Sequence, residues 1–429
     1  MNKNILVIIA DFDPYPSSNT NCIKPLLKRL LLDGYRVDIV TRRMDTDSLE
    51  HECKEGFRIW RVDDIRCINT IRINRQSKLI RNPIHKIIYK IYSVISKTYV
   101  YMKYCMFSNE KRVAGWKKTA VIEKIKRRFI NEDFGIILSI ALPEITHEIA
   151  WELKKTVFPN SKWIIYDYDP ICYNTSQFGN DSERKFYAKQ NAFYELCDKI
   201  CIGPELFEYY MNKPFAKYRE KMHVLPFANM TRFDSDRYNI EPVEREKIVC
   251  TYAGALAKDI RNPQYTVDLF SQSGISKLCE LYIITGSRTE YIKINSEIHN
   301  IFFIERLPRE EVISRLMGSS ILINIGNTVT FQVPGKIFEY MAIGKPIIHI
   351  SKIANDPTCT YLEKYPYKLI IHEMDDIENN EQKIISFVNE NKNNLIDYDS
   401  LQKIMSEYTE ESISNRFVKI VDELVAEYE

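Results

Sequence analysis

The chain has 429 residues and a formal net charge of +2; 45% of its residues are hydrophobic and 12% aromatic, with only 13 Gly and 17 Pro. This composition excludes disordered and collagen-like chains, and the length predicts two domains of about 200 residues each. Ten scattered Cys without a Cys-x-x-Cys pair, no secretory signal and no apolar run of the ~20 residues that cross a bilayer lead us to expect a cytoplasmic protein with reduced thiols.

The first elements predict a parallel sheet with crossover helices. Asn4 to Ala10 is a continuous apolar run typical of a buried parallel strand, and a polar, turn-rich loop follows it. Ile23 to Leu32 has helical spacing of apolar residues, and Arg36 to Thr41 is a second strand. This unit of strand, loop, helix and strand is half of a doubly wound sheet.

A basic segment interrupts this pattern. Residues 72–128 contain sixteen Lys or Arg and two acidic residues, a formal charge of +14, and apolar residues between Leu79 and Phe107 recur at steps of three to four. One interpretation is a packed helix pair with a solvated cationic face. The other is an interfacial surface that meets anionic lipid or a polyanionic lipid-linked substrate. Nucleic acid is not an expected partner, because the segment lacks a recognised reader motif.

Two candidate acceptor-side residues follow. Pro143 to Lys155 reads as a helix that carries His147, and Lys162 to Asp169 reads as a strand that ends in Asp167 and Asp169. Open α/β sheets bind ligands at the carboxyl ends of strands. Asp-x-Asp also resembles a metal motif, but alternate strand residues point to opposite faces, so we expect no metal.

The second half begins with a new strand and a cationic loop. After a polar linker at 229–247, Ile248 to Ala253 is a strand that leads into a loop with Gly254, Lys258 and Arg261, and a helix follows. Strand, glycine, cationic loop and helix are what a phosphate site requires. Two further strands, at 280–286 and 301–307, place Gly286, Arg306 and Leu307 at their carboxyl ends.

The stretch from Val333 to Ile348 predicts a short helix between a loop and a strand. Pro334 suits a first helical turn, and Gly335-Lys336 leave the backbone open to a ligand. The helix start would receive a phosphate, and Glu339, one turn in, would accept hydrogen bonds from sugar hydroxyls. Gly344 suits the left-handed position that ends the helix.

This layout resembles the GT-B class of glycosyltransferases that use nucleotide sugars, and the retaining family-4 group within it. The segments that carry the resemblance are "GYRVDIVT", "LPEITHEIAWELKK", "WIIYDYDP", "YAGALAKDIRNP", "LYIITGS", "FFIERLPREEV" and "VPGKIFEYMAIGKPII". The resemblance implies an α/β fold of two doubly wound, Rossmann-like domains that face a cleft, with the C-terminal helix packed back on the N-terminal domain. It divides the chain into an acceptor domain (1–230) with the basic insertion (about 72–128), a donor domain (245–408) and a crossover helix (409–429).

The resemblance also assigns roles to residues. It places Gly254, Lys258 and Arg261 at the donor pyrophosphate, Gly286 at the nucleotide, and Arg306 and Leu307 at its base. It also places Gly335 and Lys336 at the phosphate-facing helix start and Glu339 at the ribose. His147 and Asp169 are candidates for acceptor activation. The chain departs from the family at one position. The family often carries two glutamates separated by seven residues; Glu339 matches the second, and Phe331 stands at the first.

The expected function is therefore transfer of a sugar from a nucleotide-diphosphate sugar to a lipid-linked glycan in cell-surface polysaccharide synthesis, without a metal or another cofactor. Contact with an anionic membrane at the inner face of the cell membrane is a further expectation. The alternatives are a nucleotide-sugar epimerase or hydrolase on the same fold, which needs no acceptor, and a non-catalytic binding subunit that keeps the fold.

Overall fold

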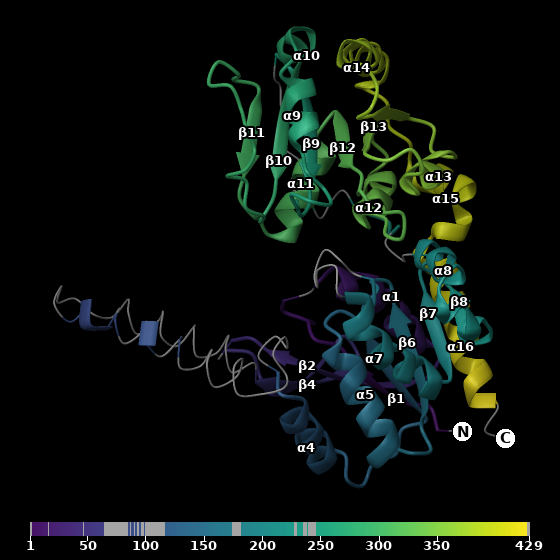
Figure 1. Cartoon of the computed structure of the whole chain (residues 1–429). Helices are drawn as coiled ribbons and strands as arrows, with labels where there is room; N and C mark the ends of the chain where they lie inside the picture. The colour runs from purple at the N-terminus through teal and green to yellow at the C-terminus, as the bar shows by residue number, and fades with distance from the viewer. Residues whose placement is uncertain are drawn as a thin grey trace. The chain divides into compact units, whose positions relative to one another are not determined.

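The computed structural model describes residues 2–15, 17–45, 47–63, 116–173, 182–226, 230–234, 238 and 246–426, together with helical residues at 85, 87–89, 91, 94, 95 and 98 (Figure 1). Most of the predicted linker and most of the basic segment therefore lie outside the described residues. The chain divides into two compact units. The first comprises Met1–Ile202, Phe215–Val224 and Asn415–Glu429, and the second comprises Gly203–Pro214 and Leu225–Ser414.

The first unit contains, among its described residues, a sheet of eight strands in the order β3-β4-β2-β1-β5-β6-β7-β8. Its strands are parallel except β3, which pairs antiparallel with β4. The elements are β1 (Asn4–Ile8), α1 (Ser18–Leu32), β2 (Arg36–Arg43), β3 (His51–Lys54), β4 (Phe57–Asp63), α4 (Lys118–Arg128), β5 (Ile136–Ile140), α5 (Ile145–Thr156), β6 (Lys162–Asp167), α7 (Ser182–Leu196), β7 (Lys199–Ile202), η2 (Pro214–Lys221), β8 (Met222–Val224) and most of α16 (Glu410–Ala426).

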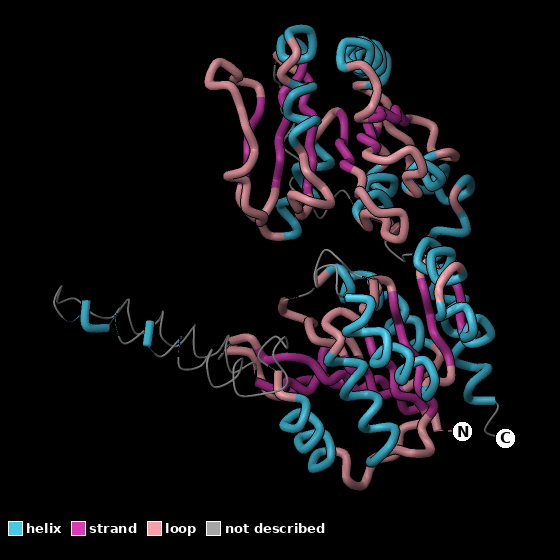
Figure 2. Tube along the Cα trace, in the orientation of Figure 1, coloured by secondary structure: helices cyan, strands magenta, loops and turns pink. Residues whose placement is uncertain are grey.

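The second unit contains, in the part of the chain that is described, a sheet of six parallel strands in the order β11-β10-β9-β12-β13-β14. Its elements are α8 (Pro204–Met211), β9 (Ile248–Ala253), α9 (Gln264–Phe270), α10 (Ser273–Leu278), β10 (Cys279–Ile284), β11 (Ile301–Ile304), α11 (Arg309–Gly318), β12 (Ile321–Ile325), α12 (Lys336–Ile343), β13 (Ile347–Ser351), α13 (Thr358–Leu362), β14 (Lys368–His372), α14 (Ile377–Asn391), α15 (Tyr398–Ile404) and η4 (Ser406–Tyr408). Helices lie on both faces of this sheet, as the doubly wound arrangement requires (Figure 2).

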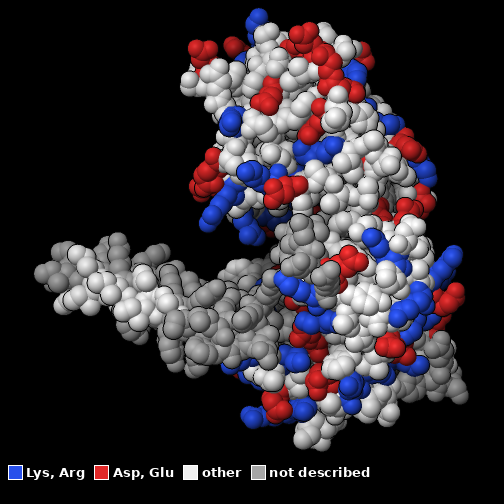
Figure 3. All heavy atoms as spheres, viewed as in Figure 1, with Lys and Arg blue, Asp and Glu red and all other residues white. Residues whose placement is uncertain are grey.

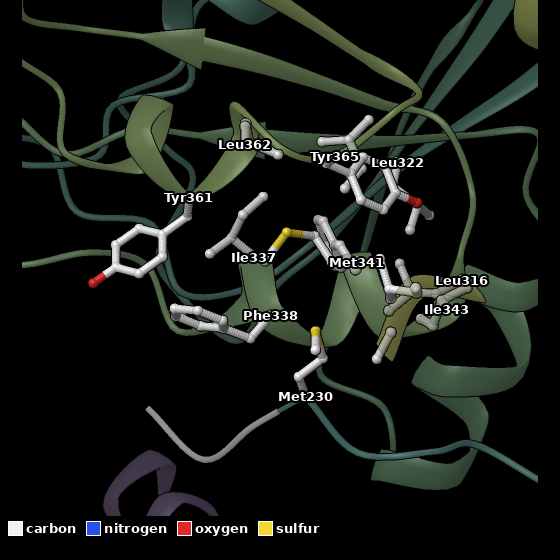
Figure 4. Packing of buried hydrophobic residues seen from close by; sticks show 14 of the residues in the cluster. Met230, Leu316, Leu322, Ile337, Phe338, Met341, Ile343, Tyr361, Leu362 and Tyr365 are labelled. Carbon is white, nitrogen blue, oxygen red and sulfur yellow. The ribbon is translucent and has the colours of Figure 1, made fainter. Parts of the chain in front are cut away.

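Two hydrophobic clusters fill the faces of the second sheet, because successive strand residues point to opposite sides. On β12, Ile321, Ile323 and Ile325 face the cluster under α9, α10 and α14, whereas Leu322 faces the cluster under α11, α12 and α15. Figure 4 shows side chains of α12 in the latter cluster together with those of α13. This double burial explains why the strands are continuous apolar runs.

The C-terminal helix returns to the first unit, as the sequence predicts. The Tyr35 hydroxyl donates to the Asp422 carboxylate, and Arg416 Nη2 donates to the Val224 carbonyl at 2.6 Å. Lys199 Nζ also lies 3.5 Å from a Glu423 carboxylate oxygen. These polar contacts flank buried apolar residues of α16, so the helix completes the core of the first unit.

One predicted helix boundary is wrong. The sequence pattern starts the first helix at Ile23, but α1 begins at Ser18, and Pro25 lies inside it. Ser17 and Thr20 form a capping box: Thr20 N donates to Ser17 Oγ at 3.3 Å, and Ser17 N donates to Thr20 Oγ1 at 3.1 Å. The cap satisfies amides of the first turn, so polar residues begin the helix before the apolar stripe does.

The end of α12 confirms the role predicted for Gly344. Its φ is +84°, in the left-handed region, and a Cβ built there would lie 2.1 Å from the carbonyl oxygen of Ile396. The Gly344 carbonyl in turn accepts a hydrogen bond from the Ile396 amide at 3.0 Å. The absence of a side chain therefore lets two backbone segments approach each other directly.

We expect Gly344→Ala to destabilise the protein more than Gly34→Ala. Gly34 has nearly the same φ, +82°, but nothing lies within 4 Å of a Cβ built there, so its substitution adds only the left-handed strain of about 1–2 kcal/mol. Gly344→Ala adds the clash with Ile396. Urea unfolding followed by circular dichroism measures both variants; equal losses would show that the clash relaxes at no cost.

Candidate functional site

The second sheet has a topological switch point between β9 and β12. From β9 the chain passes to β10 on one side, and it later returns to β12 on the other side. Loops that leave two neighbouring strands in opposite directions open a crevice, which is where open α/β sheets bind ligands. The predicted donor residues come from the loops after β9, β10 and β11 and from the start of α12, so the fold brings them to one edge of the sheet.

Arg261 joins the two loops that border this crevice. Its Nε and Nη2 donate to Asn327 Oδ1 at 3.0 and 2.7 Å, and its Nη1 donates to the Ala255 carbonyl at 3.2 Å. Asn327 is buried, and its Nδ2 donates to the Gln332 carbonyl at 2.9 Å. Within the described part of the chain, Arg261 has no carboxylate partner. The guanidinium is thus fixed in place with its charge not neutralised.

Gly254 lies where the chain leaves β9. Its amide donates to the Ile284 carbonyl at 3.0 Å, and a Cβ built at Gly254 would lie 2.8 Å from the Tyr252 hydroxyl. The Tyr252 hydroxyl donates to the Ala255 carbonyl at 2.8 Å. A side chain at Gly254 would displace that hydroxyl from the loop. Lys258, further along the loop, is exposed.

The remaining predicted base-side residues lie at the ends of β10 and β11. Gly286 and Arg306 are neighbours, because a Cβ built at Gly286 would lie 3.3 Å from Arg306 Cβ. Arg306 is exposed, whereas Leu307 is partly buried against the cluster under α11 and α12. Figure 3 shows Lys and Arg side chains gathered at the end of the second unit that carries α11. Glu305, Glu310 and Glu311 are exposed in the same stretch, so charges of both signs are present there.

Glu339 is a buried carboxylate held by two cations. Lys336 Nζ lies 2.8 Å from Oε2, and Arg309 Nη1 lies 3.0 Å from Oε1. Burial raises the pKa of Glu339, but the charges and hydrogen bonds of Lys336 and Arg309 outweigh burial and hold this pKa below its ordinary value. The carboxylate is therefore ionised at neutral pH. Arg309 was missed by sequence reasoning; the only signal is its position directly after the predicted Arg306-Leu307-Pro308.

The start of α12 has no side-chain cap, although the Ile337 amide donates to the Pro334 carbonyl at 3.0 Å. Gly335 is the N-cap with φ −58° and ψ −17°, and no side chain caps the helix. The helix is tied to β9 through Tyr340, whose hydroxyl accepts from the Ala253 amide at 2.8 Å. First-turn amides without a side-chain cap, at the positive end of the helix dipole, are suited to an oxyanion. Tyr340 was also missed by sequence reasoning.

Phe331 and Tyr209 form an aromatic pair beside this site. Phe331 lies in the loop between β12 and α12, and Tyr209 lies on α8. Their ring centroids are 4.8 Å apart at an interplanar angle of 49°. The family carboxylate that the sequence lacks at this position is therefore replaced by a ring that contacts a second ring.

His147 lies in the core of the first unit. It is 1% exposed, and its Nδ1 is 2.7 Å from Ser139 Oγ, which accepts from Trp163 Nε1 at 2.8 Å. Since Trp163 only donates, the serine proton faces Nδ1, and the histidine proton is on Nε2, which has no hydrogen-bond partner among the described residues. Burial lowers the pKa of His147 from 6.5 to about 3, so the imidazole is neutral.

Asp169 lies in a bend after β6 and is half-buried. None of the interactions of His147 involves Asp169, so the structure does not bring these two predicted catalytic residues together by contact. Asp167 is fully buried; its Oδ2 accepts from the Tyr194 hydroxyl and from Gln190 Nε2. Burial raises the pKa of Asp167 to about 7. Asp167 thus belongs to a hydrogen-bonded core network, and the acceptor roles of His147 and Asp169 stay predictions.

No protein-family model matches the sequence, and no curated protein matches it. Solved structures do resemble the fold. The chain is similar over 99% of both chains to sucrose-phosphate synthase from Thermosynechococcus elongatus, with a TM-score of 0.65 and 12% identity. The chain has the GT-B fold. This confirms the predicted fold class, including the doubly wound sheets.

Two other GT-B structures illustrate the range of this fold. WaaG, a glycosyltransferase involved in lipopolysaccharide biosynthesis, aligns over 98% of this chain and 99% of its own, with a TM-score of 0.54 and 10% identity. A UDP-N-acetylglucosamine 2-epimerase aligns over 99% and 96%, with a TM-score of 0.50 and 9% identity. At sequence identities this low, the structural similarity establishes the GT-B fold and not the reaction.

Two further observations concern membranes and metals. Among the described helices, none is both long and apolar enough to cross a bilayer. No group of three or more His, Cys, Asp or Glu side chains in the described ranges is placed to hold a metal ion. The absence of a cofactor stays a prediction.

The burial of His147 predicts a pH dependence of stability. Below pH 6.5 an unfolded chain binds a proton at this histidine that the folded chain does not bind until about pH 3. His147 therefore lowers stability as pH falls through this window, by up to about 1.4 kcal/mol per pH unit. Urea unfolding between about pH 7 and pH 5 should show a shallower loss for His147→Gln than for the natural protein.

The exposed His299 supplies the control, because His299→Gln removes a histidine without removing a buried one. We expect its pH profile to follow that of the natural protein. A His147→Gln profile that also follows it would contradict the neutral, buried state of His147.

Proposed function

We propose that this protein is a glycosyltransferase that transfers a sugar from a nucleotide-diphosphate sugar to a glycan acceptor. The observation that carries the proposal is Arg261, fixed by Asn327 beside the crevice and without a carboxylate partner among the described residues. A fixed, unneutralised guanidinium suits a diphosphate, because charge-assisted hydrogen bonds to phosphate are strong. On a GT-B fold, this arrangement supports a donor site in the second unit.

In this proposal the donor lies along the carboxyl edge of the second sheet. Arg261, Lys258 and the start of α12 at Gly335 neutralise the diphosphate. As the sugar leaves, negative charge grows on that diphosphate, and prearranged donors at this position stabilise it. Their charge is supplied by the chain itself, so the proposal requires no metal.

The nucleoside end follows from the neighbouring residues. Glu339 is ionised, and its oxygens accept hydrogen bonds from ribose hydroxyls, which share it with Lys336 and Arg309. Gly286 leaves room against Arg306 for a flat base, since a Cβ there would crowd the Arg306 side chain. Arg309 thus joins the predicted set as the residue that orients Glu339.

A lipid-linked acceptor in cell-surface polysaccharide synthesis is the more specific part of the proposal. It is supported by the basic segment in the sequence and by the similarity of the fold to WaaG, a glycosyltransferase involved in lipopolysaccharide biosynthesis. The similarity of the fold to an epimerase makes conversion of the nucleotide sugar itself the second candidate reaction. Incubation with nucleotide sugars alone separates the two: an altered sugar nucleotide without acceptor indicates an epimerase or hydrolase, and acceptor-dependent release of nucleoside diphosphate indicates a transferase.

We expect Arg261→Ala to weaken binding of nucleoside diphosphate about 10- to 100-fold, because charge-assisted hydrogen bonds to phosphate contribute about 1.5–3 kcal/mol. Arg315→Ala is the matched control, since Arg315 pairs with exposed Glu311 one turn away on α11. Isothermal titration with ADP, UDP, GDP and dTDP measures both variants. If Arg261→Ala bound as tightly as the natural protein, the donor site would be misassigned. Tight binding with no transfer to any lipid-linked acceptor extract would favour a non-catalytic subunit.

Within the basic segment, α4 (Lys118–Arg128) packs Val121, Ile122 and Ile125 in the core, whereas the described helical residues between 85 and 98 favour the interfacial interpretation for the part that contains them. Its large apolar residues Ile87, Ile88, Ile91, Val94 and Ile95 are between 57% and 64% exposed. Their spacing places them along one side of a helix. An exposed apolar stripe within a segment of charge +14 is suited to an anionic membrane surface. Peripheral contact with such a membrane is therefore part of the proposal.

We expect the double variant Ile88→Asp, Ile91→Asp to lose most of its co-sedimentation with liposomes that contain phosphatidylglycerol, because it places two charges in the apolar stripe. Leu32→Asp is the control, since Leu32 is an 81% exposed apolar residue of α1 outside the stripe. Charge reversal to Glu at Lys86, Lys90 and Lys97 should act in the same direction. Co-sedimentation that depends neither on anionic lipid nor on these substitutions would refute the membrane contact.

A further inference from the structure

The aromatic pair of Phe331 and Tyr209 is not part of the core of the second unit. Both side chains are half-buried, and neither ring belongs to the two hydrophobic clusters formed by the described residues of that unit. Lys213 Nζ lies 5.2 Å from the centre of the Tyr209 ring, a contact that helps to fix the ring on α8. The two rings are therefore partly accessible to a ligand.

The position of Phe331 in the loop between β12 and α12 brings it close to the proposed diphosphate site. The residue after Phe331 is Gln332, whose carbonyl is bound by Asn327, and Asn327 holds Arg261. The loop is thereby closed onto the cation proposed to bind the donor diphosphate. In a nucleotide sugar, the transferred sugar is attached to the distal phosphate. A sugar on a phosphate at Arg261 therefore lies next to the Phe331 loop.

The chemistry of this loop restricts the sugar. Residues 326–335 (GNTVTFQVPG) provide hydroxyls, amides and one aromatic ring, and contain no acidic or basic side chain. Neutral polar groups bind hydroxyls, and the ring face covers C–H groups. A charged sugar would find no counter-ion in these ten residues. The loop is thus suited to a neutral sugar that has an apolar face.

We propose that Phe331 and Tyr209 form an aromatic subsite that stacks on the apolar face of a neutral sugar carried by the nucleotide diphosphate. This inference rests on the proposed donor site and adds the substrate class to it. Phe331 selects the sugar, and Arg261 and Glu339 bind the nucleotide. The contribution of Phe331 therefore appears only when the sugar is present.

The test compares each nucleoside diphosphate with its sugar-bearing form. Isothermal titration of the full chain uses ADP, UDP, GDP and dTDP, each alone and as its neutral hexose derivative. For the pair that binds, Phe331→Ala should weaken the sugar nucleotide about three- to tenfold and leave the nucleoside diphosphate within about twofold. Phe331→Tyr keeps the ring and should restore binding, whereas Phe331→Leu keeps apolar volume and should not.

The matched control is Phe302→Ala. Phe302 is also partly exposed and also stacks on a tyrosine of the same unit, Tyr282, with ring centroids 4.9 Å apart. It lies on β11, away from the loop between β12 and α12, so neither ligand should bind more weakly to this variant.

The outcomes separate the two proposals. If the natural protein binds no nucleoside diphosphate, the donor site fails and this inference fails with it. If it binds, and Phe331→Ala weakens both ligands equally or neither, the donor site stands and the aromatic subsite is refuted. Tighter binding of UDP-glucuronic acid than of UDP-glucose would also refute it, because a charged sugar would then be preferred. If Phe331→Ala does not fold, the comparison of Phe331→Leu with Phe331→Tyr decides.

Discussion

The candidate site depends on the hydrogen bonds between Arg261 and Asn327. β9 and β12 are neighbours in the sheet, but the loops that follow them run in opposite directions, so contacts between the loops must hold them together. Thr328 makes two of these contacts: its amide donates to the Ile260 carbonyl and its hydroxyl to the Asp259 carbonyl, each at 2.9 Å. The Arg261 guanidinium also joins the two loops, and the burial of Asn327 makes its side-chain carbonyl oxygen a fixed acceptor. Because a neutral amide receives the bonds, the loops are joined without consuming the positive charge. The same contact therefore provides order and leaves a cation for a ligand.

The second group of charges at this edge has the opposite arrangement. Glu339 is buried and bound by Lys336 and Arg309, so the free energy lost on removing its charge from water is offset by two ionic hydrogen bonds. Among the described residues, the site thus contains a fixed cation, Arg261, that has no carboxylate partner, and a carboxylate, Glu339, that is bound by two cations. A ligand with a diphosphate at one position and hydroxyl groups at another fits this alternation better than a ligand of uniform charge.

The sequence predicted those features that depend on neighbours along the chain. Ile248–Ala253 was predicted as a strand and is β9, because a run of apolar residues with a glycine after it is a local pattern. Gly344 was predicted to end a helix, and its φ confirms it. Arg309 was missed, because its partner Glu339 is thirty residues away. The burial of His147 was also invisible, since a single histidine in an amphipathic helix has no sequence pattern of its own.

The sequence by itself therefore determined the α/β class, the order of the strands along the chain and the two doubly wound halves, because periodicity, helix caps and turn residues act over a few positions. Only the tertiary structure decided which charges are paired. Among the described residues it left Arg261 without a carboxylate partner, saturated Glu339 with two cations, and placed Tyr209 of α8 against Phe331. Each of these depends on contacts between segments far apart in the chain, and their energies are set by burial and distance, which no local pattern specifies.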